Sequence, residues 1–416
     1  MRFTRTLLVF ITGLTTPVLY AQQQASRAYD FSESVGINTH FSYTDTGYYQ
    51  QPAEVISALR KLHINHIRDG LAYFWVAPNL YAIYTQLEPA GIHPELVMPN
   101  PKNGAPSAKQ IETLLPNYPG ADAIEAPNEY DQSKDPNWVA NLSAYLPTLR
   151  QVQRDTGLPV IGPSLTKPAS YAALGVVSQH MEVNNLHAYW GGRNPETSGW
   201  GGLNSAKHAY GSMEYDFDNL NIDGPGLPVI MTESGYVASD IPKQNVIPES
   251  VEAIYEPRLV LHAWNKGIKR TYIYELMDEH SSTTGFGLLR SDFSPRPAYT
   301  ALANFMELLD DRPGDFLAGK LNYSLTGNTQ GVETTLLQKQ DGSFWLAIWL
   351  KGCIYDVNAL KATPIAPAAV QLKIADGKKV KSMWNFDEAG NAHSVLPNSA
   401  MVDLSVTSGI TLLKIN

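Results

Sequence analysis

Cysteine is almost absent from this sequence. Cys353 is the single cysteine among 416 residues, so no disulfide within the chain can hold the fold, and packing must do so. A nucleophilic thiol would need a histidine and an oxyanion-binding group beside it, and the sequence around Cys353 supplies neither. We therefore expect Cys353 to be a small, buried core residue.

Positive charge is also scarce. The chain has 31 Lys and Arg residues against 40 Asp and Glu residues, a net charge of −9, so nucleic acid is not an expected partner. No glycine-rich phosphate loop follows a predicted strand, and we expect no nucleotide or other cofactor. The 22 tyrosines and 8 tryptophans, by contrast, suit a protein that stacks aromatic rings against a neutral ligand.

Long apolar runs are missing except near the N-terminus. Residues 1–21 combine the basic Arg2 and Arg5 with an apolar stretch and a cleavage point after Ala21, which is the pattern of a secretory signal peptide. Leu19 is larger than the residue preferred at its position, so the alternative is a retained anchor. We expect removal, and hence a secreted or periplasmic protein. No other run approaches the roughly 18 apolar residues that cross a bilayer, so no further membrane contact is expected.

Short apolar runs alternate with stretches of helical period between about residues 30 and 312. The eight runs cover residues 34–38, 64–69, 92–98, 122–128, 159–164, 184–189, 228–233 and 270–275. This alternation is typical of βα units that form a parallel sheet, and eight units in roughly 280 residues match a (β/α)8 barrel. The sequence therefore predicts a TIM barrel over residues 22–314.

Several stretches between these runs carry helix signals. Pro52 opens one stretch, and Val55, Ile56, Leu59 and Leu62 place an apolar face on it. Two others, over residues 138–152 and 251–264, carry apolar stripes and are followed by Gly157 and Gly267, as at helix C-termini. The third unit leaves room for only a short helix, because residues 99–106 are rich in Pro, Asn and Gly.

The pattern changes after residues 312–314. Residues 344–349 alternate between two faces, with Trp345 and Trp349 on the same one, and turn pairs stand at Asp341-Gly342 and Asp376-Gly377. We expect residues 315–416 to form an all-β sandwich domain, with at least one of the two tryptophans in its core. The predicted fold class is thus an α/β TIM barrel followed by a β-sandwich.

Two glutamates end barrel strands. Glu129 closes the fourth run in Ala-Pro-Asn-Glu-Tyr, and Glu233 closes the seventh in Val-Ile-Met-Thr-Glu-Ser-Gly. Reacting groups of such barrels come from the C-terminal strand ends, so the two carboxyls are expected to face each other across one mouth. A proton donor paired with a nucleophile or base is what glycoside hydrolysis requires.

At these residues the chain resembles the clan A glycoside hydrolases, which are retaining (β/α)8 enzymes. The resemblance implies that Glu129 is the acid/base and Glu233 the nucleophile, and that Asn128 binds the hydroxyl beside the anomeric carbon. Arg68 resembles the strand-two arginine that supports the nucleophile. The strand-six residues His187 and Tyr189 are similar to those of the same site. A C-terminal β-sandwich is similar to that of family 39 and its neighbours.

The eighth strand departs from this pattern, since Tyr274-Glu275 stands where a tryptophan is frequent. Glu275 is expected either to accept hydrogen bonds from substrate hydroxyls or to be a loop charge. Asn38 and His40, at the end of the first run, either bind substrate or bond a neighbouring loop. Trp200, in a glycine-rich loop after the sixth run, is expected to stack against a sugar.

These features predict a secreted retaining glycosidase that acts on an oligosaccharide or polysaccharide. Two alternatives stay open: a carbohydrate-binding barrel without turnover, and a metal-dependent hydrolase on the same fold. The first run reads Asn38-Thr39-His40 and so lacks the His-x-His of barrel metallohydrolases, which is why no metal is expected. The sugar, its linkage, endo or exo action and the oligomeric state do not follow from the sequence.

Overall fold

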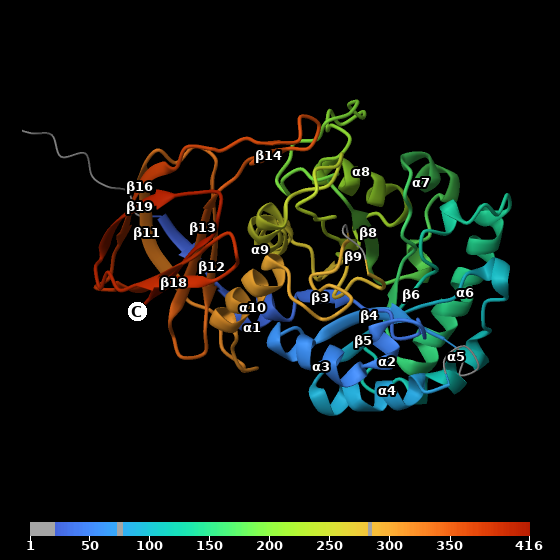
Figure 1. Cartoon of the computed structure of the whole chain (residues 1–416). Coiled ribbons are helices and arrows are strands. Elements are labelled where there is room, and N and C mark those ends of the chain that lie inside the picture. Colours follow the sequence, from blue (N-terminus) through green and yellow to red (C-terminus); the bar gives the residue numbers. More distant parts are fainter. Residues whose placement is uncertain (1–20, 73–77, 282–284) are drawn as a thin grey trace, which may run out of the picture.

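The eight predicted strands form one parallel sheet that closes on itself (Figure 1). The computed structural model describes residues 21–72, 78–281 and 285–416. The barrel strands are Val35–Asn38 (β3), His66–Gly70 (β4), His93–Val97 (β5), Ala123–Glu125 (β6), Val160–Ile161 (β7), Asn184–Ala188 (β8), Val229–Ser234 (β9) and Thr271–Ile273 (β10). Their order is β7-β6-β5-β4-β3-β10-β9-β8, and a parallel bridge between Ile161 and Val183 joins its two ends. The predicted TIM barrel is therefore confirmed.

Helices follow most strands and cover the outside of the barrel. They are Ala28–Ser32 (α1), Gly47–Gln50 (α2), Pro52–Lys61 (α3), Leu80–Leu87 (α4), Ala108–Leu114 (α5), Trp138–Thr156 (α6), Pro168–Leu174 (α7), Met213–Asp223 (α8), Glu249–Asn265 (α9) and Pro297–Leu309 (α10). The three predicted helices correspond to α3, α6 and α9, and the third unit has the short α5. Gly157 ends α6 at φ 81°, a conformation that glycine adopts without strain. In the described residues no helix is long and apolar enough to cross a membrane.

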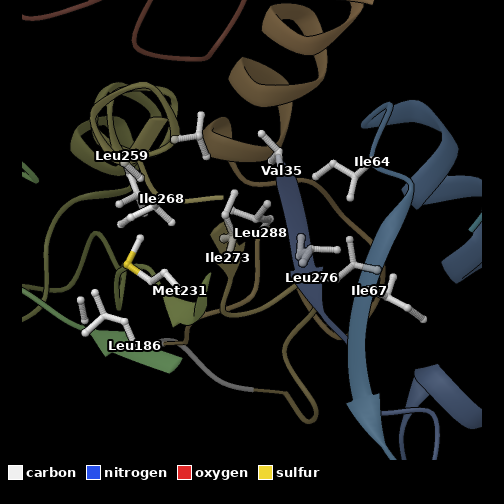
Figure 2. Close-up of a cluster of buried hydrophobic side chains, with 14 of the residues drawn as sticks. Val35, Ile64, Ile67, Leu186, Met231, Leu259, Ile268, Ile273, Leu276 and Leu288 are labelled. Carbon is white, nitrogen blue, oxygen red and sulfur yellow. The ribbon is translucent and has the colours of Figure 1, made fainter. Parts of the chain in front are cut away.

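Apolar side chains from the strands fill the space between the sheet and its helices. Figure 2 shows Val35 and Ile67 from β3 and β4 together with Leu186, Met231 and Ile273 from β8, β9 and β10. All five are buried. Burial of each such side chain contributes roughly 1.5–3 kcal/mol, which makes this cluster a main source of barrel stability.

The C-terminal region is a two-sheet β structure, as predicted. Its main strands are Lys320–Gly327 (β11), Val332–Gln338 (β12), Phe344–Leu350 (β13), Ala368–Ile374 (β16), Val380–Phe386 (β17), Ala392–Val395 (β18), Met401–Val406 (β19) and Thr411–Ile415 (β20). One sheet has the order β1-β11-β16-β19 and the other β18-β17-β20-β13-β12-β2. A small hairpin, Tyr355–Asp356 (β14) with Lys361–Ala362 (β15), extends from it toward the loops near α8 (Figure 1).

Both faces of β13 are buried. Phe344, Leu346 and Ile348 lie in the core between the two sheets, whereas Trp345 and Trp349 belong to the same apolar cluster as the barrel. Figure 1 shows α9 and α10 between the barrel and this sheet. The sandwich thus shares a continuous core with the barrel, and both tryptophans are core residues.

The first described residues correct the predicted domain boundary. Ala21–Gln24 (β1) pairs antiparallel with β11, and Ser26–Arg27 (β2) pairs parallel with β12. The prediction that the barrel begins at residue 22 is wrong for this segment, which belongs to the sandwich. Pairing at a sheet edge uses backbone groups, so a polar Gln-Gln-Gln stretch gives no side-chain signal of it. The predicted signal peptide covers residues 1–21. Residues 1–20 lie outside the described residues, and Ala21 is the first residue of β1.

Cys353 also differs from its prediction. It is half-buried rather than buried, its Sγ donates a hydrogen bond to the Tyr355 carbonyl at 3.0 Å, and the Tyr255 hydroxyl lies 3.8 Å from the sulfur. The residue stands just after β13, where the chain leaves the sheet for the β14 hairpin. Its thiol therefore has a local backbone partner instead of a purely apolar surrounding.

Candidate active site

The C-terminal ends of the barrel strands meet around one cleft of about 220 Å³. Asn38, Arg68, Asn128, Glu233 and Tyr274 line it, and they come from the ends of β3, β4, β6, β9 and β10. Parallel strands of a closed barrel end at the same rim, which explains why residues far apart in the sequence are neighbours here. Of the predicted site residues, Asn38, His40, Arg68, Asn128 and Glu233 line this cleft.

Arg68 is the centre of the hydrogen-bond network below the cleft. Its guanidinium donates from Nε and Nη2 to Glu125 at 2.6 and 2.8 Å, and from Nη1 to Glu233 at 2.7 Å. The two remaining N–H groups reach Asn38 Oδ1 at 3.0 Å and Asn128 Oδ1 at 2.7 Å. All the donors of a guanidinium are thus in use. Arg68 therefore orients protein side chains and has no free donor for a substrate.

Glu233 is held as a carboxylate. Arg68 Nη1 donates to its Oε1, and the Tyr189 hydroxyl donates to its Oε2 at 2.9 Å. Burial raises the pKa of Glu233, but the charges of His187 and Arg68 and these hydrogen bonds outweigh it, so the net pKa is below the ordinary value. A buried but ionised carboxylate at the cleft surface can attack an electrophilic carbon.

Glu129 stands at the rim with a strained backbone. Its φ and ψ are 40° and 44°, in the left-handed region, and its N–H donates to Ser164 Oγ at 3.1 Å. This conformation is unfavourable for a side-chain-bearing residue and is found most at functional sites. It directs the Glu129 carboxyl to His187 Nδ1, 2.9 Å from Oε1, and to Gln132 Nε2, 3.1 Å from Oε2. One quarter of this side chain is exposed.

The hydrogen bonds around His187 fix which nitrogen carries a proton. Asn185 Nδ2 donates to Glu125 at 2.8 Å and to the Gly162 carbonyl at 3.0 Å, so Asn185 Oδ1 accepts from the Thr232 hydroxyl at 2.6 Å. The Thr232 oxygen is then the acceptor for His187 Nε2–H at 3.0 Å. A neutral His187 consequently presents a lone pair at Nδ1, and the contact with Glu129 needs one proton that the two groups share.

Glu125 and Glu95 are two buried acids that the sequence analysis missed. They stand on the adjacent strands β6 and β5, where Glu125 is opposite Val97 and Glu95 opposite Ala123, and both are fully buried. Burial and the charge of Glu125 raise the pKa of Glu95 well above its ordinary value, whereas for Glu125 the raising effect of burial is outweighed by Arg68. The two neighbouring acids are thus shifted in opposite directions, with the negative charge favoured on Glu125, beside Arg68. Their signal in the sequence was a glutamate inside an apolar strand run, at His-Pro-Glu-Leu-Val and Ala-Ile-Glu-Ala.

The predicted binding residues Asn38 and Asn128 differ in what they leave free. Asn38 Nδ2 donates to the Thr232 carbonyl at 3.1 Å and its Oδ1 accepts from Arg68, which is the structural one of the two expected roles. Asn128 accepts from Arg68 through Oδ1, and its amide nitrogen has no partner in the described part of the chain. Asn128 is exposed at the cleft, so this nitrogen can donate to a ligand.

His40 and Glu275 form a pair at the far side of the cleft. His40 Nε2 lies 3.2 Å from Glu275 Oε2, and the Tyr43 ring stacks on the imidazole at a centroid distance of 4.7 Å. Burial lowers the pKa of His40, but the hydrogen bond and charge of Glu275 outweigh it and the net pKa is raised. Glu275 is 6% exposed and is absent from the cleft lining, which instead contains His40, Tyr43 and Tyr274. Glu275 is therefore not a solvent-exposed loop charge, and its role as an acceptor for substrate hydroxyls stays a prediction.

Trp200 lies away from the two glutamates, on a second hollow beside His187 and Tyr189. Its side chain is 39% exposed, and the Arg193 guanidinium lies 4.3 Å above its ring. One face of the indole is therefore already covered, and stacking of a sugar on Trp200 stays a prediction. Trp190, from the same loop, is buried in the barrel core.

Two groups in the described residues have the geometry of metal ligands. They are His40 with Glu275 and Glu279, and Glu129 with His187 and Glu233; within each group the ligand atoms lie within 4.8 Å of one another. Arg68 already neutralises Glu233 at 2.7 Å, and a cation in the second group would stand close to this guanidinium. Like-charge repulsion therefore disfavours a metal there.

The sequence matches no family model and no curated protein. Among solved structures it is similar to the glycoside hydrolase family 17 β-1,3-glucanosyltransferase from Rhizomucor miehei (16% identity, 63% of this chain and 95% of that one, TM-score 0.46). It is also similar to a GH2 β-galacturonidase from Eisenbergiella tayi (14% identity, 71% and 55%, TM-score 0.48). A further similar structure is an endo-laminarinase from Formosa (15% identity, 64% and 86%, TM-score 0.45). At these values the likeness carries no argument about activity.

Proposed function

We propose that the protein is a secreted, retaining glycoside hydrolase of an oligosaccharide or polysaccharide, with Glu233 as nucleophile and Glu129 as acid and base. The observation that supports this most is the pair itself: a carboxylate oxygen of Glu129 lies within 4.8 Å of one of Glu233 at the mouth of the barrel. Retaining enzymes hold their two carboxyls about 5–5.5 Å apart, whereas inverting enzymes need roughly 6.5–9.5 Å for a water molecule between them.

The first step is the transfer of the sugar to the enzyme. Glu129 gives its proton to the glycosidic oxygen while Glu233 attacks the anomeric carbon, and the leaving sugar departs as an alcohol. Arg68 and Tyr189 hold Glu233 in place and leave it ionised before the attack. His187 Nδ1 lies 2.9 Å from Glu129 Oε1, so it orients this carboxyl and shares with it the proton that passes to the glycosidic oxygen.

The second step releases the sugar. Glu129, now a carboxylate, takes a proton from a water molecule, whose oxygen attacks the anomeric carbon and breaks its bond to Glu233. The proton returns to the Glu129–His187 pair, and the starting state is restored. Asn128 stands between Arg68 and the cleft, and its free amide nitrogen is suited to a hydroxyl beside the reacting carbon.

The test is a screen of nitrophenyl glycosides and of bacterial and plant polysaccharides, with Glu233→Gln as the inactive control. Hydrolysis of at least one substrate by the natural protein and not by Glu233→Gln supports the proposal. Binding of a polysaccharide without any cleavage would instead support the carbohydrate-binding alternative. Activity that a chelator abolishes and a divalent metal restores would support the metal-dependent alternative.

A further inference from the structure

A second hollow is lined by residues that contact the two glutamates. Glu233 and Asn128 line the cleft, whereas His187 and Tyr189 line the hollow. His187 contacts Glu129 and Tyr189 contacts Glu233, so the hollow adjoins the catalytic pair through these two side chains. Under the proposed function, the sugar attacked by Glu233 occupies the cleft, and the group that Glu129 protonates departs toward the hollow.

The hollow contains an acid without a partner. Asp216, from the first turn of α8, lines it, and no side-chain hydrogen bond or ion pair of this residue occurs in the described part of the chain. Burial, and then the charge of Glu214, raises the pKa of Asp216 to about 7. None of the described residues that line the hollow is Lys or Arg. A desolvated carboxyl in this state gains from a hydrogen-bond donor that a ligand brings.

Aromatic rings surround this carboxyl. Tyr171, Tyr210, Tyr215 and Trp200 all line the hollow; the Tyr210 ring stands edge-on to Trp200 at 5.9 Å and to Tyr215 at 5.6 Å. Rings beside a few polar groups are the usual composition of a sugar site, since they pack against C–H groups while the polar atoms bind hydroxyls. The volume of about 80 Å³ admits the edge of one sugar unit and not a longer segment.

We propose that this hollow binds the leaving sugar unit and that Asp216 determines its specificity, by accepting a hydrogen bond from a hydroxyl or ammonium group of that unit. The inference rests on the proposed glycosidase function and goes beyond it by assigning a subsite and its chemistry. An anionic sugar would bring a second negative charge to the hollow that Asp216 lines, where the described lining has no Lys or Arg and Arg193 stands over the Trp200 ring instead. The hollow therefore accepts neutral sugars and amino sugars and rejects uronic acids.

The experiment uses the glycosyl fluoride that the natural protein hydrolyses, because fluoride leaves without filling the hollow. Methyl glucoside, methyl glucosaminide and methyl glucuronide are then offered as acceptors for the enzyme-bound sugar. We expect transfer to the first two and not to the glucuronide. Asp216→Asn should lower kcat/KM for an oligosaccharide, and transfer to the acceptors, by about ten- to a hundredfold, with fluoride hydrolysis unchanged.

Control variants distinguish loss of the subsite from unfolding and from failure of the proposed function. Asp218→Asn, on the same helix but bonded to Asn204 and His208, should change none of these rates. Asp216→Ala and a melting curve check that a loss is not unfolding, and a tryptophan-fluorescence titration with each acceptor measures binding without turnover. Equal loss on the fluoride and the oligosaccharide, no loss in either Asp216 variant, or glucuronide accepted as well as glucoside would overturn the inference. If no glycosyl fluoride is hydrolysed at all, the proposed function itself fails.

The acceptors also show whether an ammonium group or a hydroxyl group donates the hydrogen bond to Asp216. If Asp216 binds an ammonium group, methyl glucosaminide should be the better acceptor, and its advantage over methyl glucoside should disappear in Asp216→Asn. If it binds a hydroxyl, the two acceptors should be equally good and equally affected by the substitution. Both results support the subsite.

Discussion

The two ends of the barrel carry charged clusters that differ in their balance of acidic and basic groups. At the N-terminal end, His66 contacts Glu33 and Asp122 at 3.0 and 2.9 Å, and Arg270 contacts Asp122 at 2.9 Å, so two basic groups meet two acids. We call these four residues the base cluster, because they lie at the base of the barrel, opposite its mouth. At the mouth, Arg68 pairs with both Glu125 and Glu233, and among the described residues His187 is the basic neighbour that Glu129 and Glu233 share.

This difference separates a structural cluster from a catalytic one. A balanced set of ion pairs ties neighbouring strands together and leaves no charge for a ligand. An excess of carboxylate around an open cleft favours the positive charge that develops on a sugar ring as its glycosidic bond breaks. Charged residues at a barrel end are therefore not enough to identify a site; the imbalance and the adjoining cleft are the informative features.

Loss of the nucleophile should have the largest effect. Glu233→Gln should lower kcat by about 10⁴-fold or more, because every substrate needs the attack whatever its leaving group. The matched control is Asp122→Asn in the base cluster, which should keep kcat and lower the melting temperature. Steady-state kinetics and thermal melting of both variants measure this, and comparable activity losses would remove the distinction between the two ends.

Loss of the acid should have a smaller effect that depends on the leaving group. Glu129→Ala should retain partial activity on an aryl glycoside with an acidic phenol and lose about 10²–10⁴-fold on natural linkages, since only the latter need a proton. Azide should accelerate it and give a sugar azide of retained configuration. A uniform loss on both substrates, with an azide product of inverted configuration, would exchange the roles of the two glutamates.

A change in the base cluster should affect stability and not catalysis. Arg270→Met leaves Asp122 with His66 as its remaining basic contact, so we expect the free energy of unfolding to fall by about 1–3 kcal/mol, with kcat unchanged. Urea unfolding and kinetics at 25 °C test this. A variant as stable as the natural protein, or one that is folded but inactive, would contradict the structural role.

The smallest expected effect is that the contribution of the base cluster to the free energy of unfolding depends on pH. Burial lowers the pKa of His66, but Asp122 and Glu33 outweigh it and the net pKa is raised. A raised pKa means that this contribution is complete below the unfolded value of about 6.5 and is lost as pH rises through the folded value. The stability difference between the natural protein and His66→Gln should therefore shrink from pH 5.5 to pH 8.5 in urea unfolding. A difference that grows with pH would contradict the charge on His66.

The sequence was sufficient to predict the repeated strand and helix units of the barrel and the functional candidates at the ends of the strands. All eight barrel strands were predicted, because apolar runs buried on both faces stand out against the amphipathic helices between them. The same logic located Glu129 and Glu233, since a carboxyl that directly follows a buried strand lies at the barrel mouth. The structure places both there, together with Arg68, His187 and Tyr189.

The other features depend on contacts between residues far apart in the sequence, which no local sequence pattern reveals. The buried position of Glu125 is explained by Arg68 from β4, and that of Glu275 by His40, more than 200 residues earlier in the sequence. Strand β1 joins a sheet more than 290 residues away, mainly through its backbone, with added side-chain bonds from Gln23 and Gln24. Asp216 carries no signal in the sequence, because what distinguishes it is that its side chain has no hydrogen-bond or ion-pair partner among the described residues.

The stereochemistry of the released sugar tests the central claim most directly. Proton NMR can follow the hydrolysis of an active nitrophenyl glycoside from its first minutes, before the anomers of the product equilibrate in water. A double displacement by Glu233 and Glu129 predicts that the first sugar formed has the same anomeric configuration as the substrate. First formation of the opposite anomer would show a single displacement by water and would contradict the assignment of Glu233 as nucleophile.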